Sequence, residues 1–163
     1  GSNQPAGYQV PAGTAVTGAN GGTGVPSMNN LIDVVYGINS EYRSNGAAWS
    51  MRDATAGYIR KLTASTAGDY LWQPSLQLGQ PDRLLGYAVV ENSAMPAYGT
   101  GVKSICFGDF SSAFVIRDVG SVRIERSEER YFELDQVAWR AVLSTDSQVQ
   151  DLTAYTAFRG GTA

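Results

Sequence analysis

Residues 27–44 carry the first regular spacing of apolar positions along the chain, at steps of three and four residues. This spacing places the apolar side chains on one face of an α-helix, and Ser27 is a suitable N-cap. Asn45 followed by Gly46 is a typical helix stop. The expected inward face is Leu31, Val34, Val35, Ile38 and Tyr42. The pattern therefore predicts a single helix over residues 27–44.

A second amphipathic segment, residues 51–62, follows a short buried strand that we expect at residues 47–50. Ser50 and Asp53 have the spacing of a capping box, and Arg60 lies in the last turn, where a cation suits the helix dipole. The expected inward positions are Ala54, Tyr58, Ile59 and Leu62. Both helices should then pack against a mixed sheet.

Beyond residue 62 the pattern becomes that of strands separated by turns. The expected strands are residues 70–73, 84–91 with a central glycine, 104–108, 114–116 as a continuation of the same sheet, 122–125, 137–143 and 154–158. Gly120 is expected to form a turn or bulge, and residues 144–147 a turn. Helices amid several strands predict an α+β fold.

Alternation along two of these strands predicts their faces. Val122 and Ile124 should face away from Arg123 and Glu125. In the next strand one face is Val137, Trp139, Ala141 and Leu143. We expect Trp139 to be buried, so that Trp139→Ala would cost about 3–5 kcal/mol.

The other large aromatic residues divide into two groups. Trp49 and Trp72 lie in apolar surroundings and should also pack in the core. Tyr8, Tyr98 and Tyr155 are candidates for contact with another protein.

Length and charge limit the classes of function. The chain has 163 residues, enough for one sizeable core. Its net charge of −3 gives no sign of nucleic-acid binding. The sequence has no run of about eighteen apolar residues, so we expect no membrane span.

Residue types that catalytic and metal sites need are scarce. There is no histidine, and the single cysteine, Cys106, lies in an apolar run where we expect a buried core residue. Asp109, Asp118, Glu125 and Asp135 follow no catalytic spacing. We therefore expect no catalytic residues, no metal and no cofactor, and a protein that is not an enzyme.

Residues 1–26 are rich in glycine and proline and poor in apolar side chains, which is typical of a loop or an ordered extension. A disordered linker is the alternative. The chain begins with Gly1-Ser2, which resembles the remnant of a cleaved tag, and it has no initiator methionine. We therefore expect a piece of a longer protein.

Charges of alternating sign gather near residue 126, and we call this group the charge cluster. Its members are Arg123, Glu125, Arg126, Glu128, Glu129 and Arg130. One interpretation is a solvated hairpin end, where each exposed pair contributes roughly 0–1 kcal/mol. The other is a subunit interface, in which the charges pair between copies and set their register.

A series of short motifs runs in order through residues 3–160. The motifs are Gln4-Pro-Ala-Gly7, Leu71-Trp-Gln-Pro74, Leu85-Gly-Tyr-Ala-Val-Val90, Glu91-Asn-Ser-Ala-Met95, Phe107-Gly-Asp-Phe110 and Val122-Arg-Ile-Glu-Arg126. Taken together, they resemble the C-terminal half of tailed-bacteriophage major capsid proteins, which have the Hong Kong 97-type fold. Ala88 stands where that family commonly has proline.

The resemblance implies a division of the chain into four parts. These are a Gly/Pro-rich loop at 1–26, an axial domain at 27–110, strands of a peripheral domain at 111–145, and a return to the axial domain at 146–163. It also implies that the family's N-terminal arm, extended loop and spine helix precede residue 1. The charge cluster would then lie at contacts between subunits.

Some members of that family cross-link their subunits through a lysine–asparagine bond assisted by a glutamate. The positions that correspond to the asparagine and the glutamate fall near Val137 and Ser144, which cannot perform this chemistry. We therefore expect non-covalent contacts or accessory proteins to hold the subunits together.

The implied function is a capsid subunit that self-assembles into an icosahedral shell around viral DNA. Its partners would be other copies of itself, as hexamers and pentamers, with a scaffold, a maturation protease and a portal as further candidates. We expect no membrane and no sequence-specific nucleic acid among them. The expected location is the virion capsid, assembled in the cytoplasm of the bacterial host. The alternatives are an encapsulin-type compartment shell, a carbohydrate-binding β-module and a small hydrolase, the last disfavoured by the missing histidine.

Overall fold

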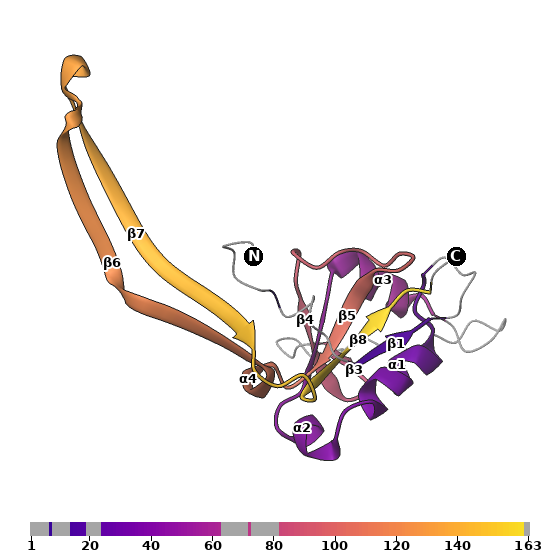
Figure 1. Ribbon diagram of the computed structural model, residues 1–163. Helices are drawn as coiled ribbons and strands as arrows, with labels where there is room; N and C mark the ends of the chain where they lie inside the picture. Colours follow the sequence, from indigo (N-terminus) through magenta and orange to yellow (C-terminus); the bar gives the residue numbers. More distant parts are fainter. Residues whose placement is uncertain (1–6, 8–13, 19–23, 63–71, 73–81, 162–163) are drawn as a thin grey trace.

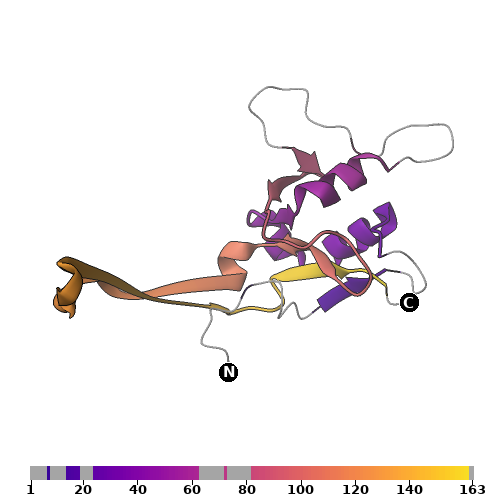
Figure 2. The same ribbon diagram turned by 90° about the horizontal axis from the view of Figure 1, so that it is seen from above.

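A computed structural model of the protein describes residues 7, 14–18, 24–62, 72 and 82–161. The described residues form two parts, which Figure 1 shows clearly apart. One is a body built on a six-stranded sheet, and the other is a two-stranded hairpin of residues 114–149, called here the long hairpin. Figure 2 shows the long hairpin extending away from the body.

The helix predicted over residues 27–44 is wrong as a single helix. α1 (Met28–Tyr36) ends at Gly37, whose amide donates to the carbonyl of Asp33 at 2.8 Å. α2 (Ser40–Ser44) begins after Asn39. Glycine and asparagine are both favoured at helix boundaries, so the chain turns between the two helices.

The start and the inward face of the predicted helix are confirmed. Ser27 caps α1, because its hydroxyl accepts from the Asn30 amide at 3.3 Å and its own amide donates to the Asn30 side chain at 3.1 Å. Four inward positions are buried and Tyr42 is half-buried. The buried four are Leu31, Val34, Val35 and Ile38.

The second predicted helix is confirmed as α3 (Asp53–Arg60), with Arg60 in its last turn, but its predicted cap is wrong. Ser50 belongs to the preceding strand β2 (Ala48–Met51), and Arg52 occupies the N-cap position without a side-chain cap bond. The inward face is also partly wrong, since only Ile59 of the four predicted positions is fully buried. The buried residues of α3 are Thr55, Ala56 and Ile59.

The sheet of the body is mixed, in the order β1-β8-β5-β2-β4-β3. Besides β2, its strands are β1 (Thr14–Thr17), β3 (Arg83–Leu84), β4 (Tyr87–Glu91), β5 (Lys103–Gly108) and β8 (Tyr155–Arg159). The pairs β1–β8 and β2–β4 are parallel, and the others are antiparallel. The prediction that the sheet is mixed is therefore confirmed.

The single strand predicted at residues 84–91 is instead the tight hairpin β3–β4. Leu85 and Gly86 form its turn, with φ angles of 51° and 87°. Positive φ at both positions is the geometry of the two-residue turn that matches strand twist, and glycine adopts it without strain. The central glycine, Gly86, therefore lies in a turn between two strands and not within one strand.

The main core lies between the sheet and the helices α1 and α3, which cover the same sheet face (Figure 2). Trp49 is fully buried there, and its ring lies 4.5 Å from that of Phe107. Its indole Nε1 donates to the carbonyl of Leu84 at 3.0 Å. Trp72 is also buried, so the core positions predicted for these two tryptophans are confirmed. The rest of the strand predicted at residues 70–73 lies outside the described residues.

The long hairpin consists of β6 (Phe114–Tyr131), a 3₁₀ turn η1 (Phe132–Leu134) and β7 (Gln136–Val149). Residues 114–116 therefore do not continue the body's sheet, and residues 144–147 are strand rather than turn. Gly120 does form the predicted irregularity, since the register shifts between Val119 and Arg123. In the part of the chain that the structure describes, no helix is long and apolar enough to cross a membrane.

Candidate assembly surface

The two strands of the long hairpin place their apolar positions together. Ile124 lies opposite Ala141, and residues directly opposite in an antiparallel pair share a face. The two apolar sets predicted by alternation therefore form one surface, called here the apolar face. Its large members are Ile116, Val122, Ile124, Val137, Trp139 and Leu143. They are exposed by between 45% and 67%, so this surface has no cover within the described residues.

Trp139 shows where the sequence expectation fails. Its side chain is 67% exposed, so the predicted burial is wrong. Alternation identified its strand and face correctly, but it does not say what lies against that face. Because the long hairpin leaves the body, the described residues put no second layer over Trp139.

The opposite face of the long hairpin carries ion pairs. Glu125 accepts from Arg123 Nε at 3.0 Å and from Arg140 Nη2 at 2.6 Å. All three side chains are well exposed, so these pairs add little stability. Val115 and Val119 also lie on this face, which is therefore mixed rather than wholly polar.

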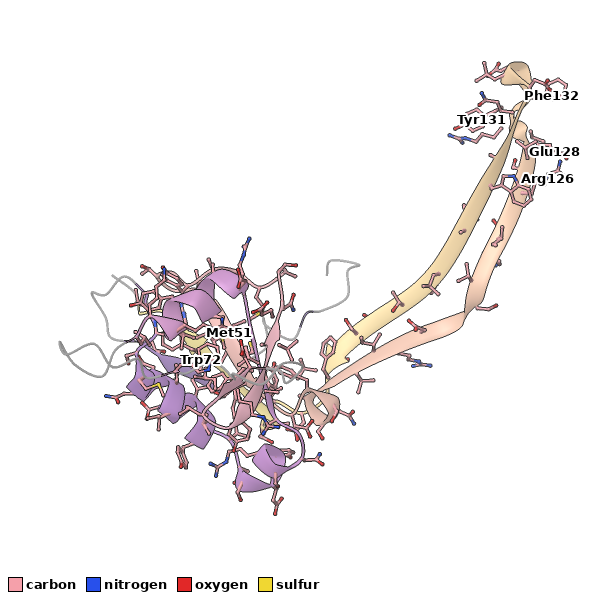
Figure 3. All side chains as sticks on the ribbon, turned by 180° about the vertical axis from the view of Figure 1, so that it is seen from behind. Met51, Trp72, Arg126, Glu128, Tyr131 and Phe132 are labelled. Atoms are coloured by element: carbon pink, nitrogen blue, oxygen red, sulfur yellow. The ribbon has the colours of Figure 1, made fainter. Side chains whose placement is uncertain are left out.

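The charge cluster does not form a single patch. Arg123 and Glu125 lie on the mixed face, whereas Arg126 lies opposite Trp139 with its guanidinium 5.9 Å from the ring centre. Arg126 Nη2 also pairs with Glu128 Oε1 at 2.5 Å, and both lie near the tip in Figure 3. Arg130 lies over the Tyr131 ring. These contacts are within one chain, and pairing between subunits stays a prediction.

The tip of the long hairpin presents exposed large apolar side chains that the sequence reasoning missed. Phe132 is 85% exposed and points away from the body in Figure 3, and Leu134 is 60% exposed. Asp135 ends the turn with a left-handed φ of 52°. The available signal was the run from Tyr131 to Leu134, which places apolar residues at the bend between two strands, where polar residues are usual.

At its base the apolar face continues into an open hollow of about 340 Å³. Phe114 and Ile116 line it from β6, and Phe110 from α4 (Phe110–Ala113). Val90 lines it from the body and is 54% exposed. The exposed apolar surface therefore reaches from the body along the hairpin.

The remaining candidate contact residues have different outcomes. Tyr155 is only 1% exposed, so its predicted role in contacts is wrong, because β8 lies inside the sheet. Tyr98 is half-buried with its ring 4.9 Å from that of Tyr58, and its contact role is untested. Tyr8 lies outside the described residues. Val137 and Ser144, the positions considered for cross-linking, are both exposed on β7.

The four carboxylates of Asp109, Asp118, Glu125 and Asp135 are not brought together. Asp109 lies in the body and the others are spread along the long hairpin as far as its tip. Among the described residues no group of acidic, cysteine or histidine side chains could hold a metal ion. Cys106 is fully buried as predicted, and burial raises the pKa of its thiol to about 12.

Asp109 has a structural role at the start of α4. Burial by itself would raise the pKa of its carboxyl, but hydrogen bonds from Ser111, Ser112 and Asn45 outweigh this effect and lower the pKa to about 2. The carboxylate accepts from the two serine hydroxyls at 2.6 and 2.7 Å and from Asn45 Nδ2 at 2.8 Å.

We expect Asp109→Asn to destabilise the protein by about 1–3 kcal/mol at neutral pH, because a charged acceptor of several hydrogen bonds is lost. The folded-state pKa is depressed, so the contribution of Asp109 is complete above about pH 4 and is lost as the pH falls toward 2. Urea unfolding at pH 7 and pH 2.5 should therefore show a difference between wild type and variant that shrinks in acid. The exposed Asp118→Asn variant is the control, and an unchanged Asp109→Asn difference at both pH values would contradict the prediction.

The model of the phage capsid family matches residues 1–158. The capsid of an empty GTA (gene transfer agent) particle is 29% identical with a TM-score of 0.72, and the match covers 93% of this chain and 49% of that chain. The capsid of a native GTA particle is 27% identical with a TM-score of 0.75, over 99% of this chain and 55% of that chain.

The structure of Gordonia phage Cozz is similar in fold, with 16% identity and a TM-score of 0.56 over 94% of this chain and 54% of that chain. A comparison with curated proteins found no match. The chain spans about half the length of the capsid chains that it resembles. These likenesses confirm the expected α+β class and the Hong Kong 97-type capsid fold. Together with the family match over almost its whole length, they show that the chain belongs to the phage capsid family.

Proposed function

We propose that this chain is part of a major capsid protein that self-assembles into the shell of a phage-like particle. The observation that carries the proposal is the exposed apolar face of the long hairpin. A two-stranded hairpin is marginally stable in water without a third strand or a packed helix. A large exposed apolar surface marks a site of contact with other protein. The face would therefore pack against capsid protein that the described residues do not include.

The division of the chain into domains is part of this proposal. One expectation is corrected, since β1 (Thr14–Thr17) lies within the segment expected to be a loop at 1–26 and pairs with β8 in the body's sheet. We assign the body to the axial domain and the long hairpin to the strands of the peripheral domain. The assignment is supported by the positions at which the long hairpin leaves the body, between Ala113 and Phe114, and returns to it, near Val149. The boundaries expected from the resemblance are residues 110 and 145. The partners would be other copies of the subunit, with a scaffold, protease and portal as further candidates. The location would be the virion capsid, assembled in the host cytoplasm.

A structural role is favoured over the alternatives. The family match and the two GTA capsids support a capsid over an encapsulin-type compartment and a carbohydrate-binding module. A carbohydrate-binding module would need exposed aromatic rings on which a sugar can stack. Trp49 and Trp72 are buried in the core. Trp139 is exposed, but Arg126 lies over its ring. We expect no catalytic activity.

The charge cluster offers a direct test of assembly. We expect the capsid protein that carries this chain to form shells, and the double variant Arg123→Glu with Arg126→Glu to form few or none. Both side chains are exposed, so their reversal should leave the subunit folded. Their contribution would be to the orientation of neighbouring copies. Electron microscopy would count particles, and circular dichroism would check the fold.

A matched variant, Lys61→Glu with Arg83→Glu, reverses two exposed charges on the body and should assemble normally. Normal shells from the hairpin variant would remove the interface role of the charge cluster. Failure of the unchanged capsid protein to form particles, even with its scaffold and protease supplied, would count against the proposed function itself.

A further inference from the structure

The long hairpin joins the body through two short segments that are tied to each other. The outgoing segment runs from Asp109 through α4, and the returning segment follows β7. The amides of Gln150 and Asp151 donate to the carbonyl of Ala113 at 2.8 and 3.3 Å, and the amide of Asp109 donates to the carbonyl of Ala154 at 3.0 Å. Both alanines are fully buried. The two bonded segments, residues 109–113 and 150–154, are called here the root of the hairpin.

α2 contacts both segments of the root through side chains. Tyr42 donates its hydroxyl to Asp151 Oδ2 at 2.7 Å, on the returning segment. Asn45, directly after α2, donates its Nδ2 to Asp109 Oδ2 at 2.8 Å, on the outgoing segment. One short element therefore holds each of the two segments that carry the hairpin.

Each of these carboxylates is already oriented by its own turn. Asp109 Oδ1 accepts from the amide of Ser111 at 3.0 Å and from its hydroxyl at 2.6 Å. Asp151 Oδ1 accepts from the amide of Thr153 at 2.8 Å and from its hydroxyl at 2.7 Å. In both residues the second oxygen accepts from the α2 region, and Asp109 Oδ2 also accepts from the Ser112 hydroxyl at 2.7 Å. Each carboxylate is held by hydrogen bonds within its own turn as well as by its bond to the α2 region, and this ordering lowers the entropic cost of the contact with α2.

α2 makes few other contacts with the body. It has five residues, all of them described and none fully buried, and its N-cap makes no side-chain bond. Such a short helix is unstable by itself. Its half-buried Tyr42 packs against both hydrophobic clusters of the body. Arg43 adds a contact with α1, since its guanidinium lies 4.8 Å from the centre of the Tyr36 ring. α2 thus contacts the body through Tyr42 and Arg43 and meets the root with the polar groups of Tyr42 and Asn45.

We propose that α2 is a clamp that fixes the direction of the long hairpin relative to the body. A single tie would let the hairpin pivot about it, whereas ties on both segments oppose rotation of the root. β6 and β7 form a sheet of their own, so their pairing with each other does not set this direction. The inference concerns the chain by itself and does not depend on the proposed function.

The test measures the distance between the body and the hairpin by electron-spin resonance on a doubly labelled chain. Asn29→Cys places one label on α1, and Ser144→Cys places the other on β7; both positions are exposed. Ser144 pairs with Val119 on the body side of the register shift, so bending at Gly120 does not contribute. Cys106, the single native cysteine, is fully buried and should not take up label.

We expect the double variant Tyr42→Phe with Asn45→Ala to broaden the distance distribution about twofold, since the freed root would sample a range of directions. Each single variant should give an intermediate width. Ser44→Ala is the matched control, because its hydroxyl bonds only to carbonyls within α2, at 3.2 and 2.9 Å, and the distribution should not change.

Circular dichroism establishes that each variant is folded. Tyr42→Phe keeps the aromatic ring, so this variant carries the test if the double variant unfolds. A distribution in folded Tyr42→Phe or in the folded double variant that is as narrow as in the wild type would overturn the clamp.

Discussion

Replacing Ile124 and Trp139 together by glutamate will abolish shell formation and leave the chain folded. Both side chains belong to the apolar face and are 66% and 67% exposed, so little core packing is lost. In an assembled shell the same positions would be covered. Arg126 lies opposite position 139 and already pairs with Glu128, so it can offset at most one of the two new carboxylates. Burying the other carboxylate without a partner would cost several kcal/mol.

The experiment compares particle yield by electron microscopy with the melting temperature of the chain. The matched control is Val119→Glu, which introduces a carboxylate at a similarly exposed valine, 58% exposed, on the mixed face of the same hairpin. We expect the control to keep most of its particle yield. Normal shells from the double variant would mean that the apolar face is not a contact surface.

Replacing Trp49 by alanine will destabilise the chain by about 3–5 kcal/mol, while the same change at Trp139 will cost less than about 0.5 kcal/mol. Trp49 is fully buried, contacts the ring of Phe107 at 4.5 Å and donates to the Leu84 carbonyl at 3.0 Å. Its removal would leave a large cavity and take one hydrogen-bond donor from the Leu84 carbonyl. Trp139 is 67% exposed, so its removal takes away little packing among the described residues.

Urea unfolding of the chain, followed by circular dichroism, would measure the loss of unfolding free energy in both variants. The circular dichroism signal of the backbone does not depend on the tryptophan that is removed. The pair of variants is its own control, since the same side chain is deleted in each. Equal destabilisation by the two changes would show that Trp139 is packed within the chain and that the long hairpin does not stand free of the body.

Local patterns predicted elements correctly where the element packs against a neighbouring element of the same chain. The three- and four-residue steps from Leu31 to Ile38 predicted a buried helical face correctly, because that face packs on the sheet beside it. The break at Gly37 was missed, because apolar spacing continues through the gap to Tyr42. Gly86 was likewise interpreted as part of a strand, although its positive φ makes it a turn.

The long hairpin shows what a sequence pattern leaves open. Alternation correctly grouped Trp139 with Val137 and Leu143, and pairing with β6 adds Ile124 to that surface. Alternation predicts which residues share a face, but it does not predict what packs against that face. The charge cluster is divided between the two faces, because alternate residues of a strand point to opposite sides. Arg126 lies opposite Trp139 on the apolar face, and Arg123 lies opposite Val142 on the mixed face.

The most direct test of the account is a reconstruction by electron cryomicroscopy of the particles formed by the capsid protein that carries this chain. We predict a closed shell in which the body and the long hairpin are both recognisable in each subunit. In that shell the apolar face around Ile124 and Trp139 should be covered by protein, either from a neighbouring subunit or from another segment of the same one. A shell in which this face is open to solvent, or a protein that forms no shell, would contradict the account.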